Sequence, residues 1–443
     1  MKMKKALILA YDFLPYVSVG GLRPYSWYKY SKESGVEPVV VTRQWDNKHG
    51  NSLDYIEVSD SKKTIVEETD CGKIIRAPYF PNLANKILLK YGEKKFRILR
   101  KAISAFYEIF QWLFFVGPKV QLYFAAKKYL QTNSVDVIIA TGEPFVLFRY
   151  ASLLSQKFDV PWIADYRDPW SQNKSRSKNV FFKKWFFYLE KKHLKNVSLI
   201  ITVSNFVKKH IITLIKNKEV ATISNGYDAS FVKDIINIKQ NSEIFSIGFA
   251  GTIYPWHPIK SFLSVINKLI LSKKINTIRV NFYGINKDAE IRQMINNEYN
   301  SLVSKVVFHS KLPNKELISK LANNNLFLLF NDYSILGTKI YDYLAVKRKI
   351  LLCYSADDEA IKLKEKYYNV EELALVNNHL QEDLIKETNS GIIVKDSACL
   401  LNVLQELYLE FQEKGFVACN SKNAEQYSRK HQVEKLAEII KAL

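Results

Sequence analysis

Short apolar runs that alternate with helical patterns constrain the fold of this chain most strongly. In the first half, runs typical of a buried β-strand occupy residues 5–11, 38–44, 135–142, 161–168, 199–205 and 220–228. Between the first two, residues 20–35 show a loop and then a helical pattern. This succession of strand, helix and strand predicts a mostly parallel sheet with helices on both faces.

The same succession starts again after a polar stretch at residues 229–244, which we interpret as a domain linker. Strand-like runs follow at residues 245–254, 277–284, 305–312, 326–332, 349–355 and 390–396. We therefore predict an α/β fold with two doubly wound, Rossmann-like domains, residues 1–230 and 244–420. The last residues, 421–443, have the pattern of one amphipathic helix. Ligands of open parallel sheets bind beyond the carboxyl ends of the strands, so we expect the site in a cleft between the domains.

The composition fits two globular domains in a reducing compartment. A chain of 443 residues with 47% hydrophobic and 25% charged residues exceeds one ordinary core. The seven histidines are dispersed and the four cysteines have no C-x-x-C spacing, which argues against a metal site and against a disulfide framework. The apolar run at residues 6–10 is short and is followed by Asp12, so we expect a first strand and not a signal peptide. No apolar run reaches the roughly 20 residues that span a bilayer. We expect a cytoplasmic protein.

The net charge of +21 leaves three classes of partner: nucleic acid, an anionic membrane or a polyphosphate ligand. Residues 85–119 and 178–195, both in the first domain, combine many basic residues with aromatic ones. Such amphipathic segments lie in the headgroup layer of anionic membranes, although core aromatics beside a solvated basic face would give the same pattern. We predict peripheral binding at the inner face of the cell membrane. Nucleic acid is not expected, because no nucleic-acid-binding motif is recognised.

In the second domain, two loops have residues suited to a diphosphate. Gly248 and Gly251 directly follow the first strand with G-x-x-G spacing, which is not the dinucleotide fingerprint, and a tight turn is the plain alternative. Thr338 is a candidate N-cap, so that Lys339 to Asp342 form the first turn of a helix. The free amides and the Lys339 ammonium would hold a diphosphate, and the Asp342 carboxylate would accept both hydroxyls of a ribose. A solvated lysine and a helix-dipole partner are the alternatives.

The first domain offers a glycine pair and an arginine at its first strand-to-helix connection. Gly20 and Gly21 permit close approach of a ligand, and Arg23 could bind an anion. A flexible loop with a surface arginine is the alternative.

Two further segments of the first domain follow strand-like runs. Asp165, Arg167 and Asp168 precede Trp170, whose flat ring suits a sugar, and Glu143 is a second carboxylate that could face the cleft. An internal Arg–Asp salt bridge that fixes the loop is the alternative for the first of these segments.

Taken together, these segments make the chain resemble the retaining glycosyltransferases of the GT-B fold, family 4 (group 1). The resemblance covers nearly the whole chain, in the order of its motifs: the Gly-Gly loop, DVIIATGEPF (136–145), IADYRDPW (163–170), LIITVSN (199–205), ISNGYD (223–228), GFAGTIY (248–254) and GTKIYDYLAVKRKILL (337–352). It implies transfer of a sugar from a nucleotide-diphosphate donor, with retention and without a metal or other cofactor. It also implies that the C-terminal domain binds the donor, the N-terminal domain binds the acceptor, and the last helix crosses back to the first domain.

The motifs carry roles over to particular residues of the second domain. Asp342 resembles the second glutamate of the family's E-x7-E pattern, which binds the donor ribose, and the first glutamate is replaced by Ser334. Gly251 matches the glycine beside the diphosphate, with Thr252 in place of the arginine that follows it. Lys260 resembles the family's phosphate-binding lysine, and Lys339 is the other candidate.

In the first domain, the family often has a histidine where this chain has YRDPW, so Asp168 or Arg167 would act there. We expect Asp168, Arg167 and Glu143 to position the acceptor or the sugar, and a donor phosphate oxygen to take the acceptor's proton. The predicted function is transfer of a hexosyl group to a lipid-linked or saccharide acceptor in cell-surface polysaccharide synthesis. A sugar-nucleotide epimerase, a phosphorylase and a non-catalytic membrane-binding protein are the rival interpretations.

Overall fold

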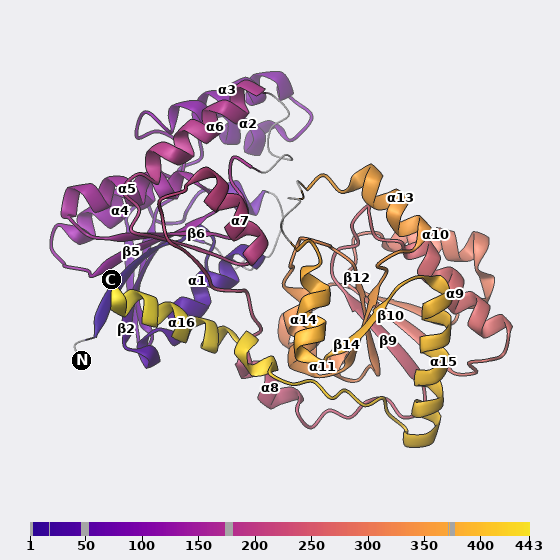
Figure 1. Ribbon diagram of the computed structural model, residues 1–443. Helices are drawn as coiled ribbons and strands as arrows, with labels where there is room; N and C mark the ends of the chain where they lie inside the picture. Colours follow the sequence, from indigo (N-terminus) through magenta and orange to yellow (C-terminus); the bar gives the residue numbers. More distant parts are fainter. Residues whose placement is uncertain (1–2, 17, 46–52, 173–179, 371, 373–376) are drawn as a thin grey trace. The chain divides into compact units, whose positions relative to one another are not determined.

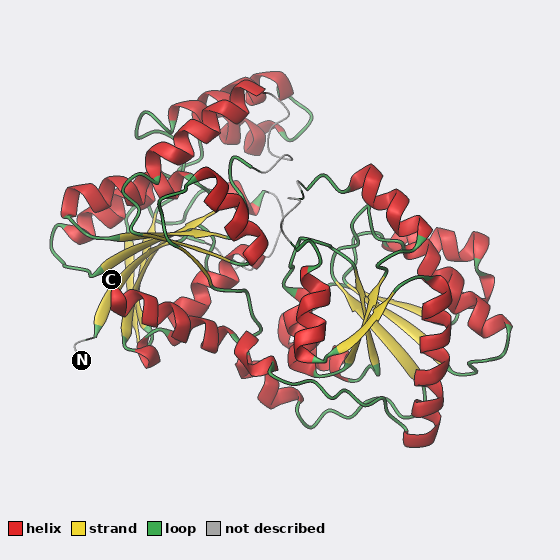
Figure 2. Ribbon diagram, viewed as in Figure 1, coloured by secondary structure: helices red, strands yellow, loops and turns green. Residues whose placement is uncertain are grey.

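Both halves of the chain fold around a mostly parallel β-sheet, as the alternating pattern predicts (Figures 1 and 2). The computed structural model describes residues 3–16, 18–45, 53–172, 180–370, 372 and 377–443. The chain divides into unit 1, which is Met1–Asn225 with Arg429–Leu443, and unit 2, which is Gly226–Ser428.

The sheet of unit 1 has the strand order β3-β4-β2-β1-β5-β6-β7-β8. Its strands are β1 (Lys4–Leu9), β2 (Val36–Arg43), β3 (Ile65–Thr69), β4 (Gly72–Ala77), β5 (Val137–Gly142), β6 (Trp162–Tyr166), β7 (Leu199–Thr202) and β8 (Val220–Thr222). All neighbouring strands are parallel except β3 and β4, which form an antiparallel pair that the sequence pattern did not predict. The mostly exposed side chains of β3 explain its omission, because an exposed edge strand lacks the apolar run of a central one. Strand β4 was missed because its apolar run is only Ile74 and Ile75.

The helices of unit 1 follow the strands in sequence. They are α1 (Val19–Tyr30), α2 (Leu83–Tyr91), α3 (Arg97–Phe110), α4 (Val120–Leu130), α5 (Val146–Phe158), α6 (Val180–His193), α7 (Asn205–Leu214) and α16 (Arg429–Ala442). The terminal helix α16 lies along α1 in Figure 1, and its apolar residues Val433, Leu436 and Ile440 join the core beneath β1. The amphipathic pattern at the chain's end is therefore explained by burial of one face in unit 1.

Unit 2 has six parallel strands in the order β11-β10-β9-β12-β13-β14. They are β9 (Phe245–Ala250), β10 (Ile278–Tyr283), β11 (Val306–His309), β12 (Leu326–Phe330), β13 (Lys349–Cys353) and β14 (Gly391–Val394). The helices are α8 (Ala229–Ile235), α9 (Ile259–Leu271), α10 (Asp288–Glu298), α11 (Asn314–Ala322), α12 (Lys339–Val346), α13 (Asp358–Tyr367), α14 (Leu380–Thr388) and α15 (Ser397–Lys414). Two apolar cores lie on opposite faces of the sheet, one under α9, α10 and α15 and the other under α11, α12 and α14.

The structure differs from the predicted linker and from the predicted final helix. Residues 229–244 include helix α8, which packs on α11 inside unit 2. Residues 421–428 also belong to unit 2, where a short 3₁₀ helix (Ala424–Tyr427) precedes α16. Residues 229–244 suggested a linker because they are polar, and residues 421–443 suggested one helix because of their amphipathic pattern. A sequence pattern does not show at which residue the chain leaves one domain and joins the other.

None of the helices within the described ranges is both long enough and apolar enough to cross a bilayer.

Candidate functional site

In unit 2, the candidate site lies where the strand order reverses. The chain passes from β9 to β10 on one side and returns to β12 on the other side of β9. The loops that follow β9 and β12 therefore leave neighbouring strands at the same edge of the sheet, which is where ligands of open α/β sheets bind.

Three predicted donor-site residues meet between these loops. The Lys339 ammonium donates a hydrogen bond to the carbonyl oxygen of Thr252 at 2.9 Å. A Cβ atom on Gly251 would lie only 2.5 Å from Cε of Lys339, and Gly251 has φ of +92°, a conformation that favours glycine. The glycine thus lets the lysine side chain cross directly over the backbone of the β9 loop.

The environment of Lys339 destabilises its charged form. Burial lowers the pKa of Lys339 to about 8, and the negative charge of Asp332 opposes part of this effect. The ammonium also lies 4.8 Å from the centre of the Phe249 ring. A desolvated ammonium of this kind gains from a bound anion, because the anion restores the stabilisation that water would supply.

Helix α12 begins at Lys339, as predicted, and Asp342 lies in its first turn. Thr338 occupies the N-cap position, but its backbone is helical, with φ of −79° and ψ of −24°. Its side chain makes no capping hydrogen bond. The predicted capping role of Thr338 is therefore wrong, because an N-cap side chain reaches the helix amides only from an extended backbone. The first-turn amides of α12 have no side-chain cap from this residue.

Asp332, which the sequence patterns did not single out, organises the loops around Lys339. Its Oδ1 atom accepts a hydrogen bond from Nε1 of Trp256 at 3.0 Å and lies 2.8 Å from Nε2 of His257. Burial lowers the pKa of His257, so the ring is neutral, with Nε2–H donating to Asp332 and Nδ1 accepting from the backbone amide of Tyr254 at 3.2 Å. The signal in the sequence was an Asn-Asp pair directly after the apolar run of β12.

Ser334, at the position of the family's first glutamate, is turned into the protein. Its hydroxyl lies 2.6 Å from the Tyr368 hydroxyl, which donates to the carbonyl oxygen of Asp332 at 3.0 Å. The Ser334 side chain is buried. It therefore stabilises the loop after β12, and no carboxylate stands at this point.

Two other residues singled out in the second domain have structural roles here. Gly248 lies inside β9, where a Cβ would meet the Asn324 side chain at 3.0 Å, so it serves packing and not the loop. Lys260, near the start of α9, forms an exposed ion pair with Glu298 at 2.6 Å.

In unit 1, the strand order reverses between β1 and β5. The loops after β1, β5 and β6 bring together the predicted residues Gly20, Glu143 and Arg167. Nε of Arg167 donates to the carbonyl oxygen of Gly142 at 2.6 Å, and Nη2 donates to that of Glu143 at 2.9 Å. A Cβ on Gly20 would displace the guanidinium of Arg167 from its present position. The side chains of Glu143 and Asp168 are exposed.

Arg23 is not the anion-binding residue that the sequence suggested. Its Nε and Nη2 atoms lie 3.0 and 2.9 Å from Oδ1 of Asp165, and Nη1 donates to the carbonyl oxygen of Ile223 at 2.8 Å. Both members of the ion pair are buried, so internal partners occupy the guanidinium. The alternative of an internal Arg–Asp pair thus holds for Asp165, although its partner is Arg23 and not Arg167. Gly21, whose amide donates to Ser18 Oγ at 3.0 Å, lies in the first turn of α1.

Trp170 is also a core residue and not an exposed platform. Its ring stacks between those of Phe145 and Trp112. The ring centres are 4.9 Å and 5.0 Å away, and the angles between the ring planes are 3° and 23°, respectively. The side chain is buried, so a sugar cannot reach its face.

We expect Gly251→Ala to abolish most donor binding, because the added methyl group would displace Lys339 and strain the backbone at positive φ. Gly337→Ala is the matched control, since a Cβ there meets nothing within 4 Å. Calorimetric titration of both variants with UDP checks this expectation. Equal affinities of the two variants would contradict the placement of the donor at Gly251.

Comparisons with known proteins agree with this fold. The family model of Glycosyltransferase Family 4 matches residues 25–231. No curated protein sequence matches the chain. Sucrose-phosphate synthase from Thermosynechococcus elongatus has a similar structure, with a TM-score of 0.58, 14% identity and coverage of 99% of this chain and 98% of that chain.

Two further solved structures align over the full length of the chain. HepE from Anabaena in complex with UDP gives a TM-score of 0.56 at 12% identity, covering 99% of this chain and 100% of that chain. The E. coli structure titled as trehalose-6-phosphate bound with UDP-2-fluoro glucose gives 0.58 at 10% identity, covering 99% of each chain. At such identities the likeness establishes the fold, two parallel-sheet Rossmann-like halves. Residues 25–231 match the model of Glycosyltransferase Family 4, and the chain has the GT-B fold of these glycosyltransferase structures.

Proposed function

We propose that unit 2 binds a nucleotide-diphosphate sugar and that its sugar is transferred, with retention, to a lipid-linked or saccharide acceptor bound by unit 1. The observation that carries this proposal is the meeting of Lys339, Gly251 and Thr252. An ammonium, a glycine that admits close approach, and the first turn of α12, which the Thr338 side chain does not cap, converge at one edge of the sheet. These are the groups that bind a diphosphate.

The chemistry needs neutralisation of the leaving diphosphate. The bond between the anomeric carbon and the phosphate oxygen breaks, and the acceptor hydroxyl forms its new bond on the same face of the sugar. The acceptor's proton passes to the departing phosphate oxygen. The Lys339 ammonium and the α12 amides stabilise the charge that develops there, which is the role a metal plays in other transferases. Asp342, one turn along α12, is suited to accept hydrogen bonds from the ribose hydroxyls.

Titration of the purified protein with UDP, GDP, ADP and TDP would test donor binding. UDP is the first choice because solved structures with this fold are titled as complexes with UDP and with UDP-glucose. We expect one diphosphate to bind clearly more tightly than the others. Failure of all four to bind would contradict the proposal. Conversion of a UDP-sugar to its epimer without an acceptor would favour the rival epimerase.

We further propose that unit 1 binds an anionic membrane surface, in agreement with a role in cell-surface polysaccharide synthesis. Helix α3 has no buried residue, and its apolar side chains Ile98, Leu99 and Phe106 are exposed, Ile98 by 86%. Basic residues Arg97 and Lys101 lie on the same helix. An exposed amphipathic helix of this composition is suited to the headgroup layer of a membrane.

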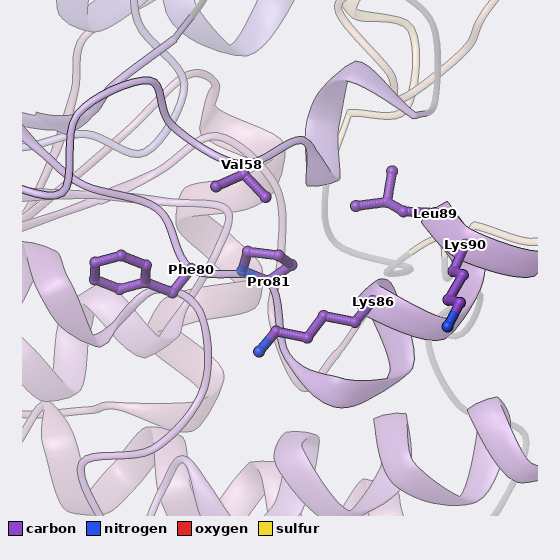
Figure 3. Close-up of a pocket in the computed structure, with 6 residues that line it drawn as sticks. All are labelled: Val58, Phe80, Pro81, Lys86, Leu89 and Lys90. Carbon is purple, nitrogen blue, oxygen red and sulfur yellow. The ribbon is translucent and has the colours of Figure 1, made fainter.

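Two neighbouring features extend this surface. An open groove of about 440 Å³ lies against α2, where Leu89 faces Val58 and Pro81, and Lys86 and Lys90 stand at its rim (Figure 3). On α6, Phe181 and Tyr188 are exposed together with basic residues. Within residues 85–119, Trp112 is buried and therefore contributes nothing to this surface.

We expect the protein to float with liposomes that contain phosphatidylglycerol, and less so as salt rises. Arg97→Glu combined with Lys101→Glu should weaken binding at least 10-fold, since each basic residue near an anionic surface contributes about 1 kcal/mol. Lys128→Glu combined with Lys157→Glu is the matched control, with the same charge change at exposed sites of α4 and α5. A protein that stays with the unbound fraction at low salt would contradict the membrane proposal.

A further inference from the structure

Two partly buried charged side chains near the carboxyl end of β1 have polar atoms without a hydrogen-bond partner among the described residues. The first is Asp12, which follows β1. Its Oδ2 atom accepts a hydrogen bond from Ser18 Oγ at 3.1 Å, whereas Oδ1 is buried and has no hydrogen-bond partner among the described residues. Burial raises the pKa of Asp12, and the nearby Arg167 guanidinium, followed by the hydroxyls of Ser18 and Tyr55, opposes the rise. A buried carboxylate oxygen without a donor is costly unless a ligand or water supplies one.

The second is Lys119, at the N-cap position of α4. Across the described part of the chain, no residue forms a hydrogen bond or an ion pair with its ammonium. Burial lowers the pKa of Lys119, and the charges of Glu108 and Asp12 act in the opposite direction. The Lys119 ammonium lies 5.9 Å from the centre of the ring of Tyr11, the residue before Asp12, and it forms no ion pair with Asp12.

Gly20 leaves room for the side chains of Asp12 and Arg167 beside it. The position that a Cβ of Gly20 would take lies 2.9 Å from Oδ2 of Asp12 and 2.2 Å from Nη1 of Arg167. Arg167 is itself fixed by the two carbonyl oxygens of the β5 loop. Any larger residue at position 20 would push the carboxylate and the guanidinium apart.

An aromatic pair lies beside the two charged groups. The Tyr16 ring stacks on that of the buried Trp45, with ring centres 4.2 Å apart and an angle of 16° between the ring planes. Tyr16 is partly exposed, and its ring centre lies 6.0 Å from that of Tyr55, which lies 5.5 Å from that of Tyr11, the residue before Asp12. Burial and then the charge of Asp12 raise the pKa of Tyr16. A fixed aromatic face next to a carboxylate is suited to the apolar face of a sugar ring.

We propose that Asp12, Lys119 and Tyr16 bind a sugar that carries an anionic group. A sugar hydroxyl donates to Oδ1 of Asp12, the anionic group accepts a hydrogen bond from Lys119, and the ring lies on Tyr16. This inference rests on the proposed function to the extent that the bound sugar is the acceptor. The acceptor is then a sugar with a phosphate or carboxylate substituent, the phosphate being either free or part of a lipid headgroup.

Calorimetric titration with glucose 1-phosphate, glucuronic acid, glucose and farnesyl phosphate tests the proposal on the full chain. We expect glucose 1-phosphate or glucuronic acid to bind at least 10-fold more tightly than glucose. Lys119→Met should remove this advantage, Lys119→Arg should retain most of it, and Asp12→Asn should weaken charged and neutral sugars alike. Binding of farnesyl phosphate that is sensitive to Lys119→Met would identify the anion as a lipid headgroup.

Two control variants distinguish this site from a general effect of surface charge and from the donor site. Lys128→Met removes an exposed lysine of α4 and should change nothing. Lys339→Met alters only the donor site of unit 2, so it should leave the binding of sugar phosphates unchanged. If Lys339→Met does not weaken UDP binding either, this result would count against the proposed function and not against the site at Asp12 and Lys119. Equal affinity for glucose and glucose 1-phosphate, no binding of any probe up to about 10 mM, or full binding by a folded Lys119→Met variant would overturn the inference.

Discussion

Lys339→Ala is expected to lower the rate of sugar transfer by about 100- to 1,000-fold, which is the usual cost of removing one group that stabilises developing charge. The lysine is placed by the β9 loop to neutralise the leaving diphosphate, so turnover should fall more than donor affinity. Transfer from UDP-glucose, or from whichever donor the titrations identify, gives the measurement. Lys362→Ala, an exposed lysine on α13, is the control. Unchanged activity of Lys339→Ala would show that the diphosphate is bound elsewhere.

The same lysine gives the reaction a pH dependence. Because burial lowers the pKa of Lys339 to about 8 in the free protein, its ammonium form is lost as the pH rises through this value. We expect kcat/KM for the donor to be maximal below about pH 8 and to fall above it, since this parameter reports groups of the free enzyme. The Lys339→Ala variant should lack this alkaline limb.

Arg23→Met is expected to destabilise unit 1 by about 3–5 kcal/mol, because it leaves the Asp165 carboxylate as an uncompensated buried charge. Asp165 is 0% exposed, and the hydroxyl of Thr141 is its other hydrogen-bond donor, at 2.8 Å. Unfolding in urea followed by tryptophan fluorescence measures this effect, because all of the seven tryptophans except Trp256 are in unit 1.

The double variant Arg23→Met with Asp165→Leu separates the ion pair from general packing. It should be more stable than Arg23→Met alone, since no buried charge remains without a partner. Lys5→Met is the control, because its ion pair with Glu37 is partly exposed, at 3.3 Å, and contributes no more than about 1 kcal/mol. If Arg23→Met has an effect as small as that of Lys5→Met, the buried pair is not a stabilising feature of the fold.

The fold was predictable because its signal is local. The central strands except β4 are apolar runs that end at turn residues, and they were placed within a few residues of their positions in the structure. The edge strand β3 was missed, since its exposed side chains carry no such signal. The sequence placed Gly251 and Lys339 in two loops of the same domain, but it did not predict their direct contact. It also did not predict the network of Asp332, His257 and Trp256 around them.

What the sequence by itself determined is the alternation of buried strands and amphipathic helices, and with it two parallel sheets whose carboxyl edges carry the functional loops. Only the tertiary structure decided which charged residues of those loops are available. Arg23 and Arg167 look alike in the sequence. In the structure, Arg23 forms an ion pair with Asp165, 142 residues away, whereas Arg167 lies beside Gly20. The physical reason is that strand patterns depend on neighbours along the chain, whereas the charge partner of a side chain depends on strands that meet only when the sheet has formed.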